Sequence, residues 1–321
     1  MKKIGVLIHP EELDAFWVEE ILANKIDVLG LHPIGGASSK TRDSLKRLIE
    51  LQENEGFQNH LKKLKNNGVE IEYAFHGISY LMPEALFDAH PDWFRMNQEG
   101  KRVADGNYCV SNQEAMQYLS DAVEKLAKIL IPSNHRYHIW QNDVHHGGCC
   151  CAACRLLSRA DQSLVVDNAI VQGLRRVDPA AMQCHLAYGD TLEVPSRIVP
   201  EDGIYLEYAP ISRDHTRPLG DLASEKNRES VAPLSGLLNY FGHAHATALD
   251  YWLDNSLFSE YKKPPEKLSL HTACVAEDAR MYAETGMEYI TTFACYLGED
   301  YRALYGAPPI KPFMELVNRS V

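Results

Sequence analysis

Eight short apolar segments, separated by longer amphipathic stretches, constrain the fold more than any other feature of this sequence. The segments have the length and the Val, Ile, Leu, Tyr and Phe content of β-strands, and they cover residues 3–9, 27–32, 70–76, 137–143, 182–189, 204–210, 247–254 and 289–296. Helical periodicity fills much of the space between them, as in residues 11–24, 44–66, 112–130, 158–176 and 277–285. Strands that alternate with helices eight times predict an α/β fold, a single (β/α)₈ TIM barrel. An open doubly wound sheet is the alternative, but neither glycine-rich nucleotide fingerprint is present.

The length agrees with one such barrel, so we expect a single TIM-barrel domain over residues 1–321. Acidic residues outnumber basic ones by 44 to 32, and a net charge of −12 argues against nucleic acid or an anionic membrane as a partner. No apolar run approaches the roughly 18 residues of a membrane span, and the stretch from Ile4 to Ile8 is too short for a signal peptide. We therefore expect a cytoplasmic protein, and the sequence leaves a homo-oligomer open.

Polar and aromatic side chains gather where the apolar segments end. In a TIM barrel the C-terminal ends of the strands carry the chemistry. The residues at or just beyond these ends are His9, His32, His76, Trp140, Asn142, Asp143, His145, Tyr188, Asp190, Glu207, Asp250, Tyr251 and Trp252. Aromatic faces stack on sugar rings, while carboxylates, amides and imidazoles bond sugar hydroxyls. The sequence therefore predicts a site for an oligosaccharide, with Trp252 equally well explained as a core residue.

Hydrolysis of a glycosidic bond needs a protonated acid at the leaving oxygen and a second group that stabilises or attacks the anomeric carbon. Asp143 is the best candidate for the acid because it ends a strand-like segment, although it could instead cap a turn. The amide of Asn142 could orient a substrate group. Glu207 is a candidate second carboxylate, and it could equally face the helices and pair with an arginine. This chemistry requires no cofactor.

Eight cysteines in 321 residues are too few for a disulfide scaffold, and four of them crowd into GGCCCAAC. Cys149, Cys151 and Cys154, with His145 or His146 close by, supply the ligand types of a Cys₃His zinc site. We expect His146 as the fourth ligand and a structural role for the metal. The alternative is a loop of buried free thiols.

Several motifs resemble the family catalogued as domain of unknown function 4838. They are HPDWF at 90–94, GKRV at 100–103, CVSNQE at 109–114, QND at 141–143 with C-x-C-x-x-C at 149–154, LAYGDTLEVP at 186–195, EYAPISRDHTRPL at 207–219 and LDYW at 249–252. Together they extend the resemblance over about residues 70 to 300. It implies a glycosidase-like TIM barrel related to glycoside hydrolase family 163, whose members are endo-β-N-acetylglucosaminidases.

The resemblance also implies a mechanism. Related enzymes use the 2-acetamido oxygen of the substrate as the nucleophile, so that Asn142 would orient that amide and Asp143 would protonate the leaving oxygen. Two other functions remain open at this point. One is a metal-dependent hydrolase or lyase that uses the histidines or the Cys/His loop, and the other is a barrel that binds carbohydrate without cleaving it.

Overall fold

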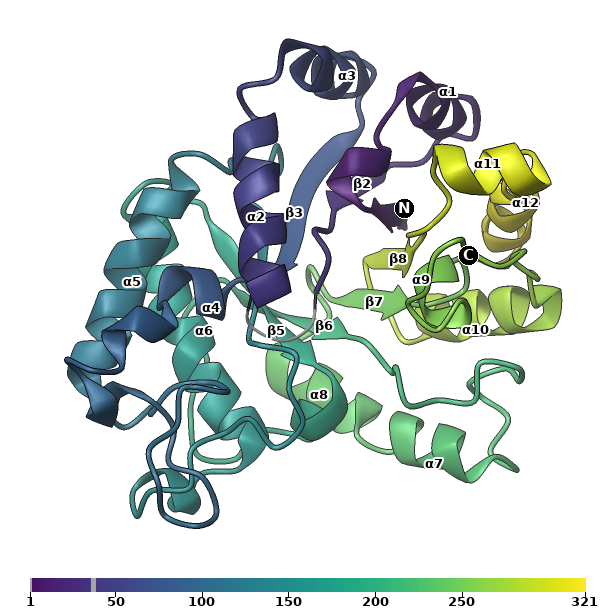
Figure 1. Ribbon diagram of the computed structural model, residues 1–321. Coiled ribbons are helices and arrows are strands. Elements are labelled where there is room, and N and C mark those ends of the chain that lie inside the picture. Colours follow the sequence, from purple (N-terminus) through teal and green to yellow (C-terminus); the bar gives the residue numbers. More distant parts are fainter. Residues whose placement is uncertain (1, 36–38) are drawn as a thin grey trace. The chain divides into compact units, whose positions relative to one another are not determined.

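The computed structural model describes residues 2–35 and 39–321, and its strands form a closed parallel barrel in the order β1 to β8 (Figure 1). The strands are β1 Lys3–Ile8, β2 Val28–Leu31, β3 Glu70–His76, β4 Arg136–Trp140, β5 Met182–Ala187, β6 Ile204–Tyr208, β7 Thr247–Asp250 and β8 Tyr289–Phe293. Each strand lies within or overlaps one of the eight apolar segments. The prediction of a (β/α)₈ barrel is confirmed.

Helices separate successive strands along the chain, except that only the 3₁₀ turn Gly189–Thr191 lies between β5 and β6. They are α1 Ala15–Ala23, α2 Ser39–Leu51, α3 Glu55–Asn66, α4 Ile78–Leu81, α5 Gln113–Ala127, α6 Arg159–Arg175, α7 Glu225–Val231, α8 Leu234–Phe241, α9 Asn255–Phe258, α10 Thr272–Glu284, α11 Glu299–Tyr305 and α12 Ile310–Ser320. Short 3₁₀ turns cover Pro10–Glu12, Glu84–Leu86, Pro91–Trp93, Cys154–Leu156 and Gly189–Thr191. Within the described residues, no helix has both the length and the apolar character needed to span a membrane.

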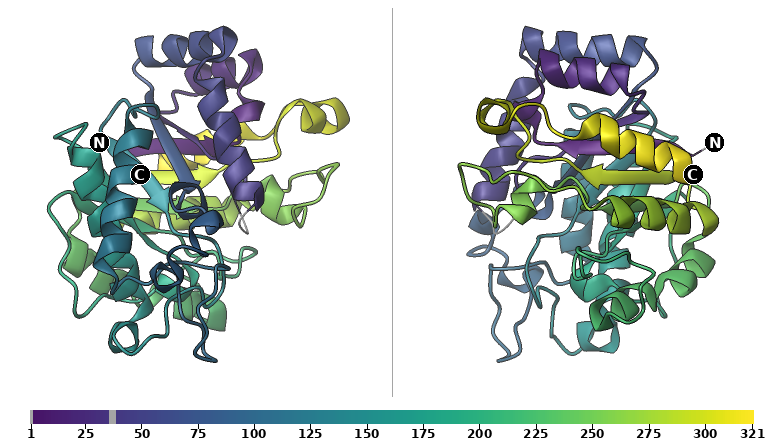
Figure 2. Two further views of the ribbon diagram at one scale, coloured as in Figure 1. Left: turned by 60° about the vertical axis from the view of Figure 1, so that its left-hand side comes forward. Right: turned by 90° about the vertical axis from the view of Figure 1, so that its right-hand side faces the viewer.

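The chain divides into two compact units. The first contains residues 1–32, 53–71 and 206–321. In it β1 pairs with β2 and with β8, and Gly5 lies in register with Val28 of β2 and Thr291 of β8. A Cβ at Gly5 would lie 2.9 Å from side-chain carbons of both Val28 and Thr291, so a larger residue would push the strands apart. On the outside of this unit α12 packs against α10 (Figure 2).

The second unit contains residues 33–52 and 72–205, with β3, β4 and β5 paired in register. Helix α6 begins with a capping box in which Ser158 and Asp161 each bond the backbone N–H of the other. Asp161 also accepts hydrogen bonds from the backbone N–H groups of Ser196, Arg197 and Ile198. One carboxylate thus fixes both the start of α6 and the segment that follows β5.

Candidate active site

Asp143 lies just beyond β4, close to His76 at the end of β3 and to Tyr188 after β5. The Tyr188 hydroxyl donates to Asp143 Oδ1 at 3.0 Å. Asp143 Oδ2 accepts no hydrogen bond from the described part of the chain. Burial lowers the pKa of His76, and the nearby charge of Asp143 opposes that shift. The second unit therefore holds one carboxylate that is half-buried, oriented by a tyrosine, and able to offer an oxygen to a ligand.

Trp140 packs edge-on against the His76 ring with their centroids 5.2 Å apart, and only 2% of it is exposed. The Nδ1–H of His76 donates to the carbonyl oxygen of Gln141, whose amide bonds Ser163 in α6. These contacts fix the backbone just before Asp143. Trp140 and His76 thus support the end of β4, and a substrate contact by either of them stays a prediction.

Asn142 organises the loops around Asp143. Its Oδ1 accepts from the backbone N–H of Ser79, its Nδ2 donates to the carbonyl oxygen of Gly106, and its own N–H donates to the Asn107 side chain. Described residues take one of the two amide hydrogens of its Nδ2 group. The side chain is therefore held rigidly, with one donor left for a ligand.

Asn142 also lines an open pocket of about 360 Å³, counted to include its mouth. The charged residues of that pocket are Arg42, Glu84 and Asp105, and Ser79 and Tyr108 supply hydroxyl groups. Convergent charged and hydroxyl groups of this kind suit a polar ligand such as a sugar. Sequence reasoning singled out none of these five residues, since they follow helical or irregular segments far from Asn142 in the chain.

Asp190 holds the loop after β4 by accepting the backbone N–H of His146 at 2.6 Å. The His146 ring lies 3.6 Å from the same oxygen and is largely exposed, and His145 is exposed as well. The structure brings Asp190 and the two histidines together at the protein surface. A substrate contact by His145 or Asp190 stays a prediction.

Histidine and aromatic rings also gather at the strand ends of the first unit. The Nδ1–H of His9 donates to the carbonyl oxygen of His32 at 2.7 Å, and the two rings stack 5.9 Å apart. Burial lowers the pKa of His9 to about 4, so this imidazole is neutral at pH 7. Phe293 packs against His32 on one side and stacks on Tyr251 on the other.

Glu12, in the 3₁₀ turn after β1, is a candidate functional residue that sequence reasoning missed. Its Oε2 is buried and accepts no hydrogen bond from the described residues. Burial raises the pKa of Glu12 to about 7, although the charge of Lys263 acts in the opposite direction. A carboxylic acid that titrates near neutral pH is suited to proton transfer. Its position three residues after His9, beyond a strand end, was the signal available in the sequence.

Asp250, at the end of β7, lies in a buried ion-pair network. Arg213 Nη1 and the Tyr282 hydroxyl each lie 2.7 Å from Asp250 Oδ2, and the N–H of Tyr251 donates to Oδ1. The other end of the Arg213 guanidinium bonds Asp278 at 2.7 Å. None of Asp250 is exposed. These contacts hold Asp250 in the core, and a substrate contact by it stays a prediction.

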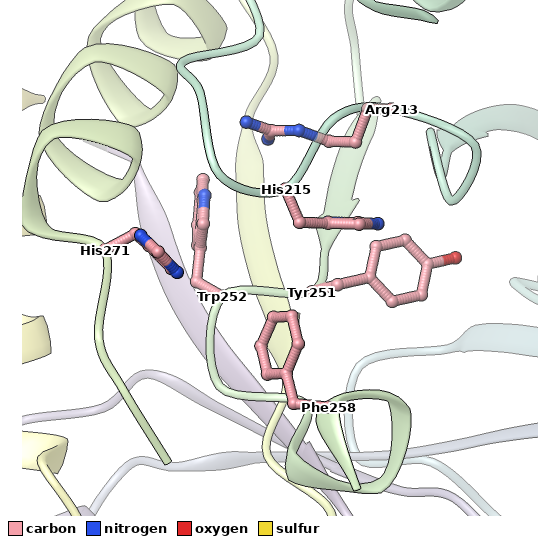
Figure 3. Close-up of a pocket in the computed structure, with 6 residues that line it drawn as sticks. All are labelled: Arg213, His215, Tyr251, Trp252, Phe258 and His271. Carbon is pink, nitrogen blue, oxygen red and sulfur yellow. The ribbon is translucent and has the colours of Figure 1, made fainter. Parts of the chain in front are cut away.

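Trp252 belongs to the same core. Its indole N–H donates to Asp278 Oδ2 at 3.1 Å, and its ring packs against Phe313 of α12. A small pocket beside this network is lined by Arg213, His215, Tyr251, Trp252, Phe258 and His271 (Figure 3). In Figure 3 the rings of His215 and Tyr251 lie between Arg213 at the top and Phe258 at the bottom.

Glu207 is buried in β6, with 1% of it exposed. The hydroxyl of the next residue, Tyr208, donates to the carbonyl oxygen of Ser230 in α7, so Tyr208 faces the helices. Neighbouring residues of a strand point to opposite faces. Glu207 therefore faces away from the helices, which decides the question that the sequence left open.

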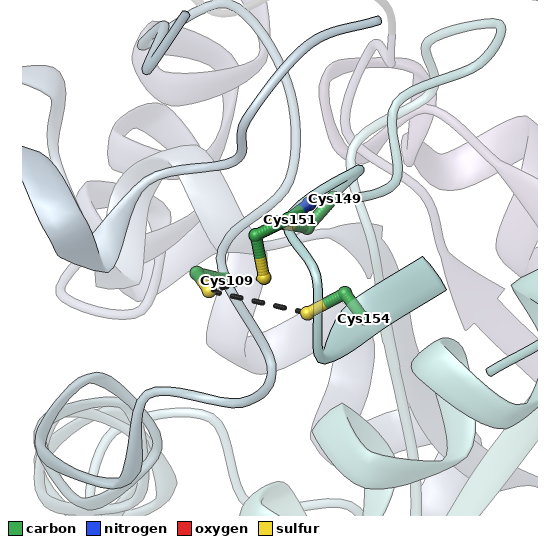
Figure 4. Close-up of side chains that lie close together, drawn as sticks. All are labelled: Cys109, Cys149, Cys151 and Cys154. Atoms are coloured by element: carbon green, nitrogen blue, oxygen red, sulfur yellow. Dashed lines mark hydrogen bonds between the residues drawn. The ribbon is translucent and has the colours of Figure 1, made fainter. Parts of the chain in front are cut away.

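Four buried cysteines converge beside the loop after β4 (Figure 4). The Sγ atoms of Cys109, Cys149, Cys151 and Cys154 all lie within 4.8 Å of one another, and this group could hold a metal ion. The expected fourth ligand, His146, lies outside the group because its ring is turned to the surface beside Asp190. Cys109 takes that place, and sequence reasoning missed it because it lies 40 residues before Cys149.

Several solved structures share the fold of this chain. The GH42 β-galactosidase Gan42B matches 99% of this chain and 56% of its own chain, at a TM-score of 0.57 and 12% identity. A tri-modular GH5 endo-β-1,4-glucanase from Bacillus licheniformis matches 100% of this chain and 60% of its own chain, at a TM-score of 0.56 and 8% identity. A GH20 module of the pneumococcal exo-β-D-N-acetylglucosaminidase StrH matches 99% of this chain and 84% of its own chain, at a TM-score of 0.52 and 10% identity. The chain thus has the TIM-barrel fold found in these glycoside hydrolases, and it spans little more than half the length of the first.

Residues 40–241 match the model of the family described as Domain of unknown function (DUF4838). The chain belongs to this family, as the motifs of its sequence suggested. No curated protein matches the chain.

Proposed function

We propose that the protein is a glycoside hydrolase that cleaves an oligosaccharide containing amino or uronic sugars. The observation that carries the proposal is Asp143, a carboxylate at the C-terminal end of β4 with one oxygen held by Tyr188 and the other without a partner among the described residues. The glycosidases of similar fold support the class of reaction, and the resemblance to family 163 supports an amino sugar. The particular sugar is part of the proposal.

In the proposed reaction Asp143 protonates the glycosidic oxygen as the bond to the anomeric carbon breaks. Tyr188 keeps the carboxyl group in one orientation, so that its second oxygen is presented to the leaving group. Asn142 donates its remaining amide hydrogen to the substrate. In a substrate-assisted reaction the acceptor would be the 2-acetamido oxygen, which attacks the anomeric carbon.

The proposal is tested by comparing Asp143→Asn with the parent on nitrophenyl glycosides of N-acetylglucosamine, galactose and glucuronic acid. General acid catalysis contributes about 10²- to 10⁴-fold, so the variant should lose that much turnover. The loss should be larger on a glycoside whose leaving group is a poor one, because such a group depends more on protonation. Asp178→Asn is the matched control, since Asp178 pairs with His135 before β5.

Full turnover by Asp143→Asn on a glycoside with a poor leaving group, such as a methyl glycoside that the parent cleaves, would refute the assignment of the acid. If the parent binds these sugars by calorimetry and cleaves none of them over days, the barrel is a carbohydrate-binding protein and the proposed reaction is wrong.

A further inference from the structure

The spacing of four sulfur atoms beside the loop after β4 is that of ligands around one metal ion. Cys109 Sγ lies 3.8 Å from Cys151 Sγ and 3.9 Å from Cys154 Sγ. A disulfide would need about 2.05 Å, and all four cysteines are free thiols. Zinc–sulfur bonds of about 2.3 Å in a tetrahedron place the sulfurs about 3.8 Å apart. The observed separations therefore match metal-bound thiolates.

Hydrogen-bond donors surround these sulfurs. The backbone N–H groups of Met96 and Cys151 point to Cys149 Sγ at 3.3 and 3.5 Å, and Arg102 Nη1 lies 3.8 Å from the same atom. The Ser111 hydroxyl lies 3.2 Å from Cys109 Sγ. Donors of this kind stabilise thiolates over thiols and orient ligands around a metal.

The grouping is selective. Cys150 is part of the same sequence cluster, yet its Sγ turns away to Arg159 Nη2 at 3.6 Å and the residue is only partly buried. The C-x-C-x-x-C spacing of residues 149–154 thus directs three side chains inward and one outward. Cys109 joins them from a separate loop, so the convergence comes from the fold and does not follow from sequence adjacency.

The surrounding chain has little regular structure to hold it together. The segment from Phe94 to Cys109 is tied by two isolated β-bridges, Phe94↔Tyr108 and Met96↔Arg102. The segment after β4 reaches α6 through irregular backbone and one 3₁₀ turn. A metal ion bound by both segments would stabilise this irregular part of the chain.

We propose that Cys109, Cys149, Cys151 and Cys154 bind one zinc ion in a closed structural site. Four protein ligands leave no position for a substrate or water, so the ion takes no part in chemistry. The cationic side chain of Arg102 offsets part of the charge of four thiolates around Zn²⁺.

The site would also fix the candidate active site. Cys109 lies two residues after Asn107, whose side chain accepts the N–H of Asn142. On the other side, the Gln162 amide in α6 bonds the backbone of both Cys149 and Cys154. The ion would thereby join the two loops that flank Asn142 and Asp143. The zinc site itself does not depend on the glycosidase proposal.

Metal analysis of the full-length protein, purified without chelators, should find one zinc per chain. Cys109→Ser should lower the zinc content at least about tenfold. Two control variants should keep it: Cys150→Ser, next to two ligands, and His146→Ala, which tests the ligand that the sequence suggested.

Because ligand variants can fail to fold, the parent provides a second measurement. Titration of its thiols with p-hydroxymercuribenzoate should release zinc into a chromogenic chelator, and zinc should protect four of the eight thiols from a milder reagent. A parent that contains no metal and whose buried thiols react without any release of zinc would overturn the proposal. Iron in place of zinc would overturn it too, as would loss of zinc in His146→Ala but not in Cys109→Ser.

Discussion

Replacing Glu72 by glutamine removes the negative charge from a buried cluster that joins β3 to β4 beneath the candidate site. Glu72 Oε1 accepts hydrogen bonds from Arg136 Nε at 2.9 Å and from Asn134 at 2.7 Å, and Oε2 lies 3.0 Å from His138 Nε2. The Arg136 guanidinium lies over the Tyr205 ring, and the side chains of Arg136 and Glu72 are 1% and 3% exposed. The variant would leave the Arg136 charge in the interior without its carboxylate.

The pKa of Glu72 gives the size of the effect. Burial alone would raise this pKa, but the charges of His138 and Arg136 outweigh it and lower the pKa from 4.5 to about 2. A difference of about 2.5 units corresponds to about 3 kcal/mol of unfolding free energy at pH 7. Removing one partner of a buried ion pair lowers the unfolding free energy by about 3–5 kcal/mol, which is similar to the value from the pKa of Glu72.

The same pKa fixes the pH dependence. Because the folded-state pKa of Glu72 is below the unfolded value, its stabilisation is complete above pH 4.5 and is lost as the pH falls toward 2. The difference in unfolding free energy between the parent and Glu72→Gln should therefore shrink to less than roughly half between pH 7 and pH 3.

Urea unfolding followed by circular dichroism measures both quantities. At a slope of about 3 kcal/mol per molar urea, the midpoint of Glu72→Gln at pH 7 should fall by about 1 M. Glu124→Gln is the control, since Glu124 pairs with Lys128 and Arg176 on the surface and should change the midpoint little. A Glu72→Gln midpoint equal to that of the parent, or a difference that persists unchanged at pH 3, would show that the cluster does not stabilise the fold as argued.

Two further predictions concern packing and pH. A Cβ at Gly173 in α6 would lie 2.3 Å from the carbonyl oxygen of Ser120 in α5, so Gly173→Ala should lower the unfolding free energy by about 1–3 kcal/mol. Gly220→Ala is the control, because the nearest atom to a Cβ at Gly220 lies 3.9 Å away. Equal urea midpoints for the two variants would contradict this prediction. Burial raises the pKa of Glu12 from 4.5 to about 7, so the folded state loses stability as the pH rises from 4.5 to about 7 and changes little above that. Glu12→Gln should accordingly gain melting temperature relative to the parent between pH 5 and pH 8, and a constant difference would argue against a perturbed Glu12.

The sequence predicted the barrel because burial of strands imposes a local pattern. Residues 27–32 and 204–210, for example, contain the observed strands Val28–Leu31 and Ile204–Tyr208 almost residue for residue. The predicted segments run a little too long, since residues such as Ala209 and Pro210 follow the last residue of the strand, Tyr208. A strand can thus be recognised from one short stretch of sequence, and eight such stretches are enough to predict the fold class.

The partners of individual side chains were not predictable in this way. Arg213 reaches Asp250 and Asp278 across 37 and 65 residues of sequence, and Cys109 reaches Cys149 across 40. Such contacts depend on how irregular loops fold over the strand ends, which no periodic pattern encodes. Proximity in the sequence was misleading for His146, which is near the cysteines in the chain but turned toward Asp190 in space.

Asp143 and Asp250 show what the structure adds to a list of polar residues at strand ends. Both aspartates follow apolar segments, and nothing local distinguishes them in the sequence. In the structure both oxygens of Asp250 are engaged by an arginine, a tyrosine hydroxyl and a backbone N–H, and none of it is exposed. From the residues that the structure describes, Asp143 receives a single hydrogen bond, that of Tyr188, and it is only half-buried. An acid must present an oxygen that no protein group already occupies, and of these two carboxylates Asp143 alone meets that condition.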